Sequence, residues 1–519
     1  MRCLWTSIRA YRLVVEGVEN VERVERVKRI GAFWALAISA FAVLGAAAVW
    51  MGGLNQDEGW YLYAANLVAE GKMPYRDFFF TQGPMLPYVY SAFAWIWKGW
   101  GLLGARIFTL SLGVVGLLFA VGLARRHVPE EKRSAVSLIA LLLLGSNLYH
   151  LYFLAIPKTY ALAALFVFVG FYVLSVAVER ARGLAVLAGL SLAFAAGTRI
   201  SLGALLAVCG VWLLLSRQGK TLLWFCIGGF AGLGLVYLPF LCNADARAGL
   251  IAAQQYHAAR GGFDVVWVVG SVSRLVRWYL PVFVVLGLGV GAWMVKDKGQ
   301  RTEDNGKGSP VVLLYAFLAV FAVQMLAPFP YEDYQVPVMG LLAVYAAVAF
   351  VTASTSTSSL HLLLVLGLCF ANSFGSPLLE KWSTNGQDRF WSLKKEKFEL
   401  PQLRDVARRI EALDPDGKEL LTQDLYLAIE TGRKVPAGLE MGPFSMLSDE
   451  EWRRLLGHCS CGIAALSGYS FAIEPPVCRE RSMDCQMEYW SILKRNYKLV
   501  EREEAFGQNA TPLLILKRK

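Results

Sequence analysis

The stretch Asn55–Tyr61, with the sequence NQDEGWY, follows the first apolar run that is long enough to cross a bilayer. It places two adjacent carboxylates, Asp57 and Glu58, at the mouth of a membrane-length segment. Ionisable groups in such a place are costly and usually serve a function. The stretch therefore predicts a membrane enzyme whose chemistry takes place at the outer bilayer surface.

The composition of the whole chain fits a polytopic membrane protein. Of its 519 residues, 56% are hydrophobic, and the mean hydropathy is +0.45, which lies outside the range of soluble globular domains. The net charge of +11 is weak evidence for an anionic partner, because most Lys and Arg residues lie in short loops between apolar runs, where they set topology. We expect no nucleic-acid partner.

Spans of roughly 20 apolar residues are needed to cross about 30 Å of hydrocarbon. About eleven runs of suitable length lie near 31–51, 101–124, 135–154, 159–178, 183–199, 202–216, 221–242, 275–295, 310–327, 336–352 and 359–377. The segment 85–100 is shorter and rich in Pro, Trp and Tyr, so we expect an interfacial or partly inserted helix there.

Basic residues set the expected orientation. They lie in the N-terminal arm 1–30 and on alternate connections, such as 125–133 and 296–307, which the positive-inside rule assigns to the cytoplasm. The arm is expected to be an amphipathic cytoplasmic segment that leads into a signal anchor, and not a cleavable signal peptide. The predicted fold is mainly α: a membrane helix bundle over 31–379, followed by a small exoplasmic α/β domain over 380–519.

The tail 380–519 is charged and rich in turns. Helices are expected at 401–413 and 449–456, and short buried strands at 419–421, 462–466 and 513–516. The tail also holds four cysteines, Cys459, Cys461, Cys478 and Cys485. In an exoplasmic domain their spacing favours two disulfides over a zinc site, with the pairing left open.

Polar residues that topology does not require gather at the outer ends of the expected spans. They are Asp57, Glu58, Arg76, Asp77, Gln82, Lys158, Arg199, His257, Arg260, Glu332 and Asp333. Few charges occur in mid-span and no repeated halves are visible, whereas ion-coupled transporters place ionisable groups near the midplane and often show such repeats. We therefore expect one outward-facing polar site.

This set of residues suits one type of reaction. A carboxylate can act as general base on an acceptor hydroxyl, while Lys and Arg can bind a phosphate and stabilise its charge as it leaves. The sequence shows no Walker loop, no nucleotide-binding glycine pattern and no His/Glu metal cluster. These observations predict transfer from a lipid phosphate to a hydroxyl, with no metal and no cofactor besides the lipid-linked donor.

The stretch Asp57–Ala65, followed by Gly71–Phe78 and Gln82–Pro84, resembles the first outer loop of GT-C glycosyltransferases. The likeness is closest to bacterial relatives of protein O-mannosyltransferases and of the aminoarabinose lipid A transferase (glycosyltransferase family 39-like). Pro157-Lys158 resembles a family position near the donor phosphate, and Tyr331–Pro337 resembles the late outer loop. The resemblance covers roughly 31–350 in layout and is strong only over 55–90.

What the resemblance implies is an inverting, metal-independent transfer of a sugar from a polyprenyl-phosphate donor. Asp57 matches the catalytic acidic position, and Lys158 matches a phosphate contact. Two departures stand out: Thr81–Pro84 replaces the His-Lys-Pro-Pro of many relatives, and Glu332-Asp333 replaces their frequent His-Tyr. The first removes a basic contact, and the second leaves the acceptor side open.

We expect Asp57 to be the catalytic base, aided by Glu58 or Asp77, within a catalytic first outer loop 52–100. Lys158 and Arg199 are expected to hold the donor phosphate. Further substrate contacts are expected at Arg76, Asp77, Gln82, Glu332 and Asp333.

Simpler structural explanations exist for most of these residues. Asp57 could cap a helix over 59–69, Arg76 and Asp77 could form a local salt bridge, and Lys158 and Arg199 could be helix-end residues that snorkel. The aromatic residues at positions 60, 61, 63, 95, 97 and 100 are expected to form an interfacial belt.

Three other functions remain open: an oligosaccharide ligase or polymerase with a diphosphate-linked donor, a lipid or solute transporter, and a scaffold whose tail binds partners. The sugar is not specified, and the exoplasmic acceptor can be protein, lipid or glycan. Because the closest-looking relatives are bacterial, the expected location is the bacterial inner membrane, with the N-terminus cytoplasmic.

Overall fold

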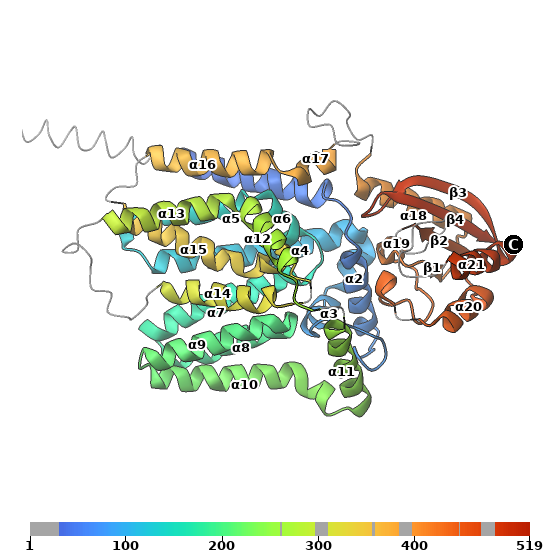
Figure 1. The fold of residues 1–519 in the computed structure, drawn as a ribbon, viewed down its shortest axis with the longest axis horizontal. Coiled ribbons are helices and arrows are strands. Elements are labelled where there is room, and N and C mark those ends of the chain that lie inside the picture. The colour runs from blue at the N-terminus through green and yellow to red at the C-terminus, as the bar shows by residue number, and fades with distance from the viewer. Residues whose placement is uncertain are drawn as a thin grey trace, which may run out of the picture.

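The computed structural model describes residues 31–259, 262–295, 310–327, 329–354, 359–383, 397–445, 447–468 and 483–519. A bundle of helices makes up one part of the molecule, and a small sheet with short helices lies at one end of it (Figure 1). The predicted fold class is therefore confirmed. The N-terminal arm 1–30, expected to be amphipathic, lies outside the described residues.

The bundle consists of long apolar helices that run roughly side by side (Figure 1). They are Gly31–Trp50, α4 (Ala94–Arg126), α5 (Arg133–Gly145), α6 (Leu148–Ala155), α7 (Thr159–Glu179), α8 (Ala185–Thr198), α9 (Ala204–Leu215), α10 (Gly219–Leu241), α13 (Leu280–Val295), α14 (Val311–Met325), α15 (Val336–Ala353) and α16 (Ser359–Phe374). Short 3-10 turns join several of them: η1 (Glu130–Lys132), η2 (Arg182–Leu184), η3 (Ile200–Gly203) and η5 (Glu332–Gln335).

Five of the described helices are long and apolar enough to cross a membrane, and up to eight spans result if each bent pair counts as one. The bent pairs break at 146–147, 279 and 375–376, by 69°, 81° and 44°. Three shorter apolar helices add to these, so that every apolar run expected from the sequence corresponds to a helix or a bent pair. The apolar helices define a multi-pass membrane protein.

Four further helices connect or flank those of the bundle. They are α2 (Gln56–Ala69), α3 (Met85–Ser91), α11 (Ala244–Ala258) and α12 (Val265–Trp278). The first three lie at the end of the bundle nearest the sheet (Figure 1). The segment 85–100, expected to be interfacial, forms α3 and the first turns of α4, and a positive φ of 61° at Gly101 breaks the path of α4 there. Only glycine adopts this conformation without strain.

The tail contains a four-stranded sheet in the order β1-β2-β4-β3. Its elements are α17 (Pro377–Ser383), α18 (Glu399–Leu413), β1 (Leu420–Leu421), α19 (Leu425–Thr431), η6 (Gly442–Phe444), α20 (Asp449–His458), β2 (Ile463–Ser467), α21 (Met483–Asn496), β3 (Tyr497–Phe506) and β4 (Thr511–Arg518). β1 pairs parallel with β2, and β4 pairs antiparallel with β2 and β3. The expected strands and helices of the tail are present, and β3 was missed because its sequence YKLVEREEAF is largely charged and exposed.

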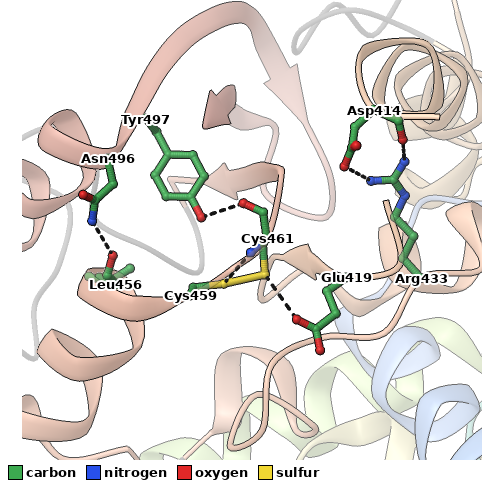
Figure 2. The surroundings of a disulfide bond; sticks show 8 residues. All are labelled: Asp414, Glu419, Arg433, Leu456, Cys459, Cys461, Asn496 and Tyr497. Atoms are coloured by element: carbon green, nitrogen blue, oxygen red, sulfur yellow. Dashed lines mark hydrogen bonds and ion pairs between the residues drawn. A yellow bond between two sulfur atoms is a disulfide. The ribbon is translucent and has the colours of Figure 1, made fainter. Parts of the chain in front are cut away.

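A disulfide joins Cys459 and Cys461 at the start of β2 (Figure 2). The Tyr497 hydroxyl donates a hydrogen bond of 3.0 Å to the Cys461 carbonyl, which ties the bridge to β3. Of the four tail cysteines, Cys478 and the side chain of Cys485 lie outside the described residues, so the second expected disulfide stays a prediction.

One hydrophobic core is shared by the first outer loop and the tail. It includes Leu62 on α2, Leu102 on α4 and Tyr426 on α19, all fully buried. Gly59 on α2 lies so close to α19 that a Cβ atom would meet the Tyr426 nitrogen at 2.4 Å. Close packing of this kind fixes the relative position of two elements, so the tail sheet is anchored to the helix that follows Asn55.

Candidate active site

The start of α2 is fixed by a capping box. The Asn55 side chain accepts a hydrogen bond of 3.0 Å from the Asp57 amide, and the Glu58 carboxylate accepts one of 2.9 Å from the Asn55 amide. Such reciprocal bonds satisfy amides that the first helical turn leaves unpaired. Because the Asn55 side chain provides the cap, the Asp57 carboxylate remains available for other partners.

Lys158 lies between two carboxylates that are far apart in sequence. Its Nζ is 2.8 Å from Asp57 Oδ2 and 3.0 Å from Asp333 Oδ2. The Trp60 indole donates to the other Asp57 oxygen at 3.0 Å, and the Tyr160 hydroxyl donates to Asp333 at 2.7 Å. We call Asp57, Lys158 and Asp333 the carboxylate–lysine cluster; it joins α2, the start of α7 and η5.

Arg199 extends this cluster with a second cation. Its guanidinium donates to the Thr159 hydroxyl at 3.0 Å and stacks on the rings of Tyr160 and Tyr334, 4.9 and 4.6 Å from their centroids. The buried Nε of Arg199 has no hydrogen-bond partner among the described residues. A buried donor without a partner costs free energy, and it is an expected feature of a site for an anion.

Electrostatics favour the charged forms of Asp57 and Lys158. Burial by itself raises the pKa of the Asp57 carboxyl, but the charge of Lys158 and the hydrogen bonds from Lys158 and Trp60 together outweigh it and leave the pKa below its ordinary value. Burial likewise lowers the pKa of the Lys158 ammonium, and the charges of Asp333 and Asp57 raise it well above its ordinary value. The Asp57 side chain is 22% exposed and the Lys158 side chain is 10% exposed, so Asp57 is the more accessible of the two.

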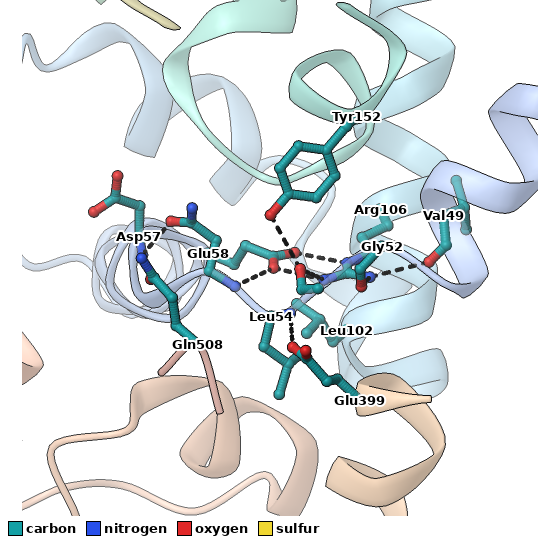
Figure 3. A network of polar contacts seen from close by, with 12 residues as sticks. Val49, Gly52, Leu54, Asp57, Glu58, Leu102, Arg106, Tyr152, Glu399 and Gln508 are labelled. Atoms are coloured by element: carbon teal, nitrogen blue, oxygen red, sulfur yellow. Dashed lines mark hydrogen bonds and ion pairs between the residues drawn. The ribbon is translucent and has the colours of Figure 1, made fainter. Parts of the chain in front are cut away.

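Glu58 lies elsewhere, although it is the next residue after Asp57. Both of its carboxylate oxygens accept hydrogen bonds of 2.7 Å from Arg106, and both side chains are completely buried (Figure 3). Arg106 also donates to the carbonyls of Val49, Gly52 and Gly53. The Glu58 carboxylate is fully engaged inside the protein and holds the loop that enters α2, which favours a structural part for it over the expected catalytic one.

Other candidate residues lie apart from the cluster. Arg76 and Asp77 pair with each other at 2.7 Å and are partly exposed, and the hydrogen bonds to Asp77 lower its pKa to about 2. Glu332 pairs with Arg274 on α12 at 3.0 Å. The structure thus shows the local salt bridge for Arg76 and Asp77, and it directs Glu332 away from Lys158.

Gln82 lines a cavity of about 290 Å³ whose lining includes none of Asp57, Lys158 and Asp333. The cavity is also lined by Thr81, Ile200 and His257, and Ile200 directly follows Arg199. The His257 ring lies 2.8 Å from the Thr81 carbonyl, so α11 and the first outer loop close one side of this cavity. Arg260 lies outside the described residues.

Sequence reasoning missed some residues of this region. Arg106 was visible as a single arginine inside an apolar run, which is itself a signal. Trp60 was expected in an interfacial belt, yet it is only 3% exposed and binds Asp57. Tyr61, Tyr63 and Trp97 are buried as well, whereas the exposed residues at positions 95 and 100 fit a belt.

Among the described residues, no group of three or more His, Cys, Asp or Glu side chains could hold a metal ion. The cations of the site are Lys158 and Arg199, and the arrangement suits an anionic ligand beside a carboxylate.

No family model matches the sequence, and no curated protein is similar enough to match. The fold, however, resembles solved structures. It is similar to ArnT from Cupriavidus metallidurans bound to undecaprenyl phosphate, with a TM-score of 0.61 and 13% identity over 93% of this chain and 98% of the ArnT chain. It is also similar to ArnT from the same organism in the apo state, with a TM-score of 0.59 and 14% identity over 94% of this chain and 98% of the ArnT chain.

These matches define the class: the chain is a membrane protein of the GT-C fold, as the resemblance of its first outer loop implied. An oligosaccharyltransferase from Archaeoglobus fulgidus is also similar over 93% of this chain and 74% of that chain, with a TM-score of 0.45 and 14% identity. The nearly complete coverage of ArnT includes the tail, for which the sequence showed no resemblance.

Proposed function

We propose that this protein is a membrane glycosyltransferase. It moves a sugar from a polyprenyl-phosphate donor to a hydroxyl of an acceptor at the outer surface, with inversion at the anomeric carbon. Support comes from the fold, which it shares with a protein crystallised with undecaprenyl phosphate. The proposed location is the inner membrane of a bacterium, with the carboxylate–lysine cluster on the outer side.

The observation that carries this proposal is the position of Lys158 between Asp57 and Asp333, next to the unpaired Nε of Arg199. An ammonium has three donors, and two of them are used by these carboxylates. Its remaining donor and the Arg199 Nε give two cationic donors for one phosphate. Asp57, the carboxylate that we propose to bind the acceptor, is paired with the same lysine.

In the proposed step, the acceptor oxygen forms a bond to the anomeric carbon as the bond from that carbon to the phosphate oxygen breaks. The acceptor proton passes to Asp57, and the electron pair of the broken bond stays on the polyprenyl phosphate. Lys158 and Arg199 stabilise that charge. The polyprenyl phosphate leaves, and the sugar stays on the acceptor.

The ion pair also explains how a carboxylate with a low pKa can serve as a base. A general base works best when its pKa lies near the working pH. A donor phosphate that binds Lys158 shares the positive charge that holds the pKa of Asp57 down. Donor binding therefore raises the basicity of Asp57 at the moment it is needed.

The first test is mass spectrometry of lipids that copurify with the detergent-extracted protein. We expect polyprenyl phosphate, bare or glycosylated, on the wild type and its loss from Lys158→Ala/Arg199→Ala. A matched control is Lys434→Ala/Arg454→Ala, which removes the same two charge types from the exposed surface of the tail. Only bulk phospholipid on every sample would contradict a donor site and favour a transporter or scaffold.

The second test uses synthetic polyprenyl-phosphate donors that carry a radiolabelled sugar, and it measures transfer as the loss of sugar from the lipid. Asp57→Asn should retain donor binding and lose transfer by about 10²–10⁴-fold, the usual contribution of a positioned general base. A diphosphate-linked donor used in preference to the monophosphate would instead support a ligase or polymerase.

A further inference from the structure

We infer that the tail positions the catalytic base: the turn between β3 and β4 caps the helix that carries Asp57, across the boundary between tail and bundle. This inference rests on the proposed function, because it assigns a part to Gln508 in the reaction at Asp57. Gln508 is a positioning residue, since it touches α2 and not the reacting atoms.

The contact is a hydrogen bond to the start of α2. The side-chain oxygen of Gln508 accepts a hydrogen bond of 2.9 Å from the backbone amide of Gln56, which directly precedes Asp57. Figure 3 shows Gln508 reaching from the tail towards the helix that carries Asp57 and Glu58. The first amides of a helix have no partner within it, and the Asn55 side chain accepts from the Asp57 and Glu58 amides but not from the Gln56 amide. The tail therefore completes the cap that Asn55 leaves unfinished.

The Gln56 side chain is held by the tail as well. Its Nε2 donates to Asp424 Oδ1 at 2.7 Å, and the Tyr426 hydroxyl donates to the same oxygen at 2.9 Å. All three side chains are buried, with exposed fractions of 3% or less. Backbone and side chain of Gln56 are thus both held by tail residues, while the side-chain oxygen Oε1 has no hydrogen-bond partner among the described residues.

The turn that supplies Gln508 is shaped for close contact with α19. Gly507 has a positive φ of 71°, and a Cβ atom there would meet the Tyr426 hydroxyl at 2.4 Å. Gly507 thus allows the turn to approach Tyr426, and this approach brings the next residue, Gln508, to α2. The same Tyr426 packs at its backbone against Gly59 one turn further along α2.

The consequence for the reaction is geometric. The membrane side holds the first turn of α2 through Arg106 and Glu58, and the tail holds it through Gln508 and Asp424. With both contacts in place the first turn cannot tilt, and the Asp57 carboxylate stays at Lys158. Displacing a catalytic group by about 1 Å can cost about 10²-fold in rate.

The test compares Gln508→Ala, Gln508→Glu and a control in the full-length protein, using the synthetic donor. Gln508→Ala should lower kcat by about 10- to 100-fold and leave KM for the donor unchanged within about twofold. Gln508→Glu keeps an acceptor oxygen and should restore most of kcat. The control is Lys434→Met, which removes another contact between tail and α2, the pair with Glu70 at the far end of the helix, and should change neither constant.

A second measurement does not depend on activity. Hydrogen exchange of a peptide covering residues 54–62 reports the Gln56 amide directly. We expect faster exchange in Gln508→Ala, but not in Gln508→Glu or Lys434→Met. If the wild type fails to transfer sugar, the proposed function is contradicted, while this experiment still tests the cap. Unchanged exchange and kcat in Gln508→Ala, or a rise in KM that accounts for the lost rate, would overturn the inference.

Discussion

Asp57 and Glu58 are neighbours, yet the structure predicts opposite results when each loses its charge. Glu58→Gln leaves the Arg106 guanidinium completely buried and without a countercharge. Removing one partner of a buried ion pair costs about 3–5 kcal/mol. We therefore expect this variant to be destabilised by that amount, because the loop from Val49 to Gly53 also depends on Arg106.

Asp57→Asn should behave differently. The amide oxygen can still accept the bond from Trp60, and the amide nitrogen takes the place of the oxygen that meets Lys158, which keeps Asp333 as a countercharge at 3.0 Å. The side chain is partly exposed, where the charge of an ion pair contributes about 1 kcal/mol or less. The expected variant is folded, nearly as stable as the wild type, and inactive in transfer.

The assay is thermal unfolding in detergent, followed by fluorescence-detected size exclusion, with transfer measured on the surviving folded fraction. Glu58→Gln should lower the unfolding temperature strongly, and its folded fraction should retain activity. A stable but inactive Glu58→Gln would refute the assignment and return Glu58 to the chemistry. Asp57→Asn that unfolds as readily as Glu58→Gln would show that Asp57 is structural.

Three further predictions concern the same region. The pKa of Asp57 is held below its ordinary 3.8, so its ion pair contributes fully to stability above that value and is lost only as the pH falls through the lower folded pKa. The profile of kcat/KM against pH should therefore show no acid limb from Asp57 between about pH 5 and 8. A limb in that range that disappears in Asp57→Asn would contradict the depressed pKa. In Lys158→Met, the lysine charge no longer opposes the rise in the Asp57 pKa that burial causes. The pKa of Asp57 should therefore rise, and the residual activity should fall on the acid side of its pH profile. A flat pH profile would show that Lys158 does not control the pKa of Asp57. Gly59→Ala forces a methyl group against the Tyr426 backbone and should lower the stability measured by thermal unfolding by about 1–3 kcal/mol. The control is Gly99→Ala, whose methyl group meets open space. Equal stability of the two variants would disprove the close packing of α2 on α19.

The sequence was sufficient to predict the helices, because apolar runs of membrane length have few alternatives to a helix in a bilayer. The bends were missed although residues that interrupt or begin helices flank each break, namely Gly145, Pro281, and Gly375 with Pro377, because each apolar run continues across its break and was interpreted as one span. The charged strand β3 was missed for a different reason. Its stability comes from pairing with β4, which no local pattern in its own sequence announces.

For the site, the sequence indicated which polar residues lie at the ends of the apolar runs, but not which of them meet. Lys158 and Asp333 are 175 residues apart, and only the folded bundle brings them together. The sequence favoured Asp57 over Glu58 as the base, but it did not show where the Glu58 carboxylate points. Adjacent residues on a helix point about 100° apart, so one carboxylate faces Lys158 and the other faces Arg106, and the direction of the helix decides which.

The bonds at the start of α2 join residues made at opposite ends of synthesis. The Leu54 amide donates to Glu399, 345 residues later, and the Gln56 amide donates to Gln508, 452 residues later. Both partners follow all the apolar helices in the chain, so the proposed reaction centre is completed last. A prematurely terminated chain would therefore reach the membrane as an inserted bundle without an organised reaction centre, which separates membrane insertion from catalytic competence during biogenesis.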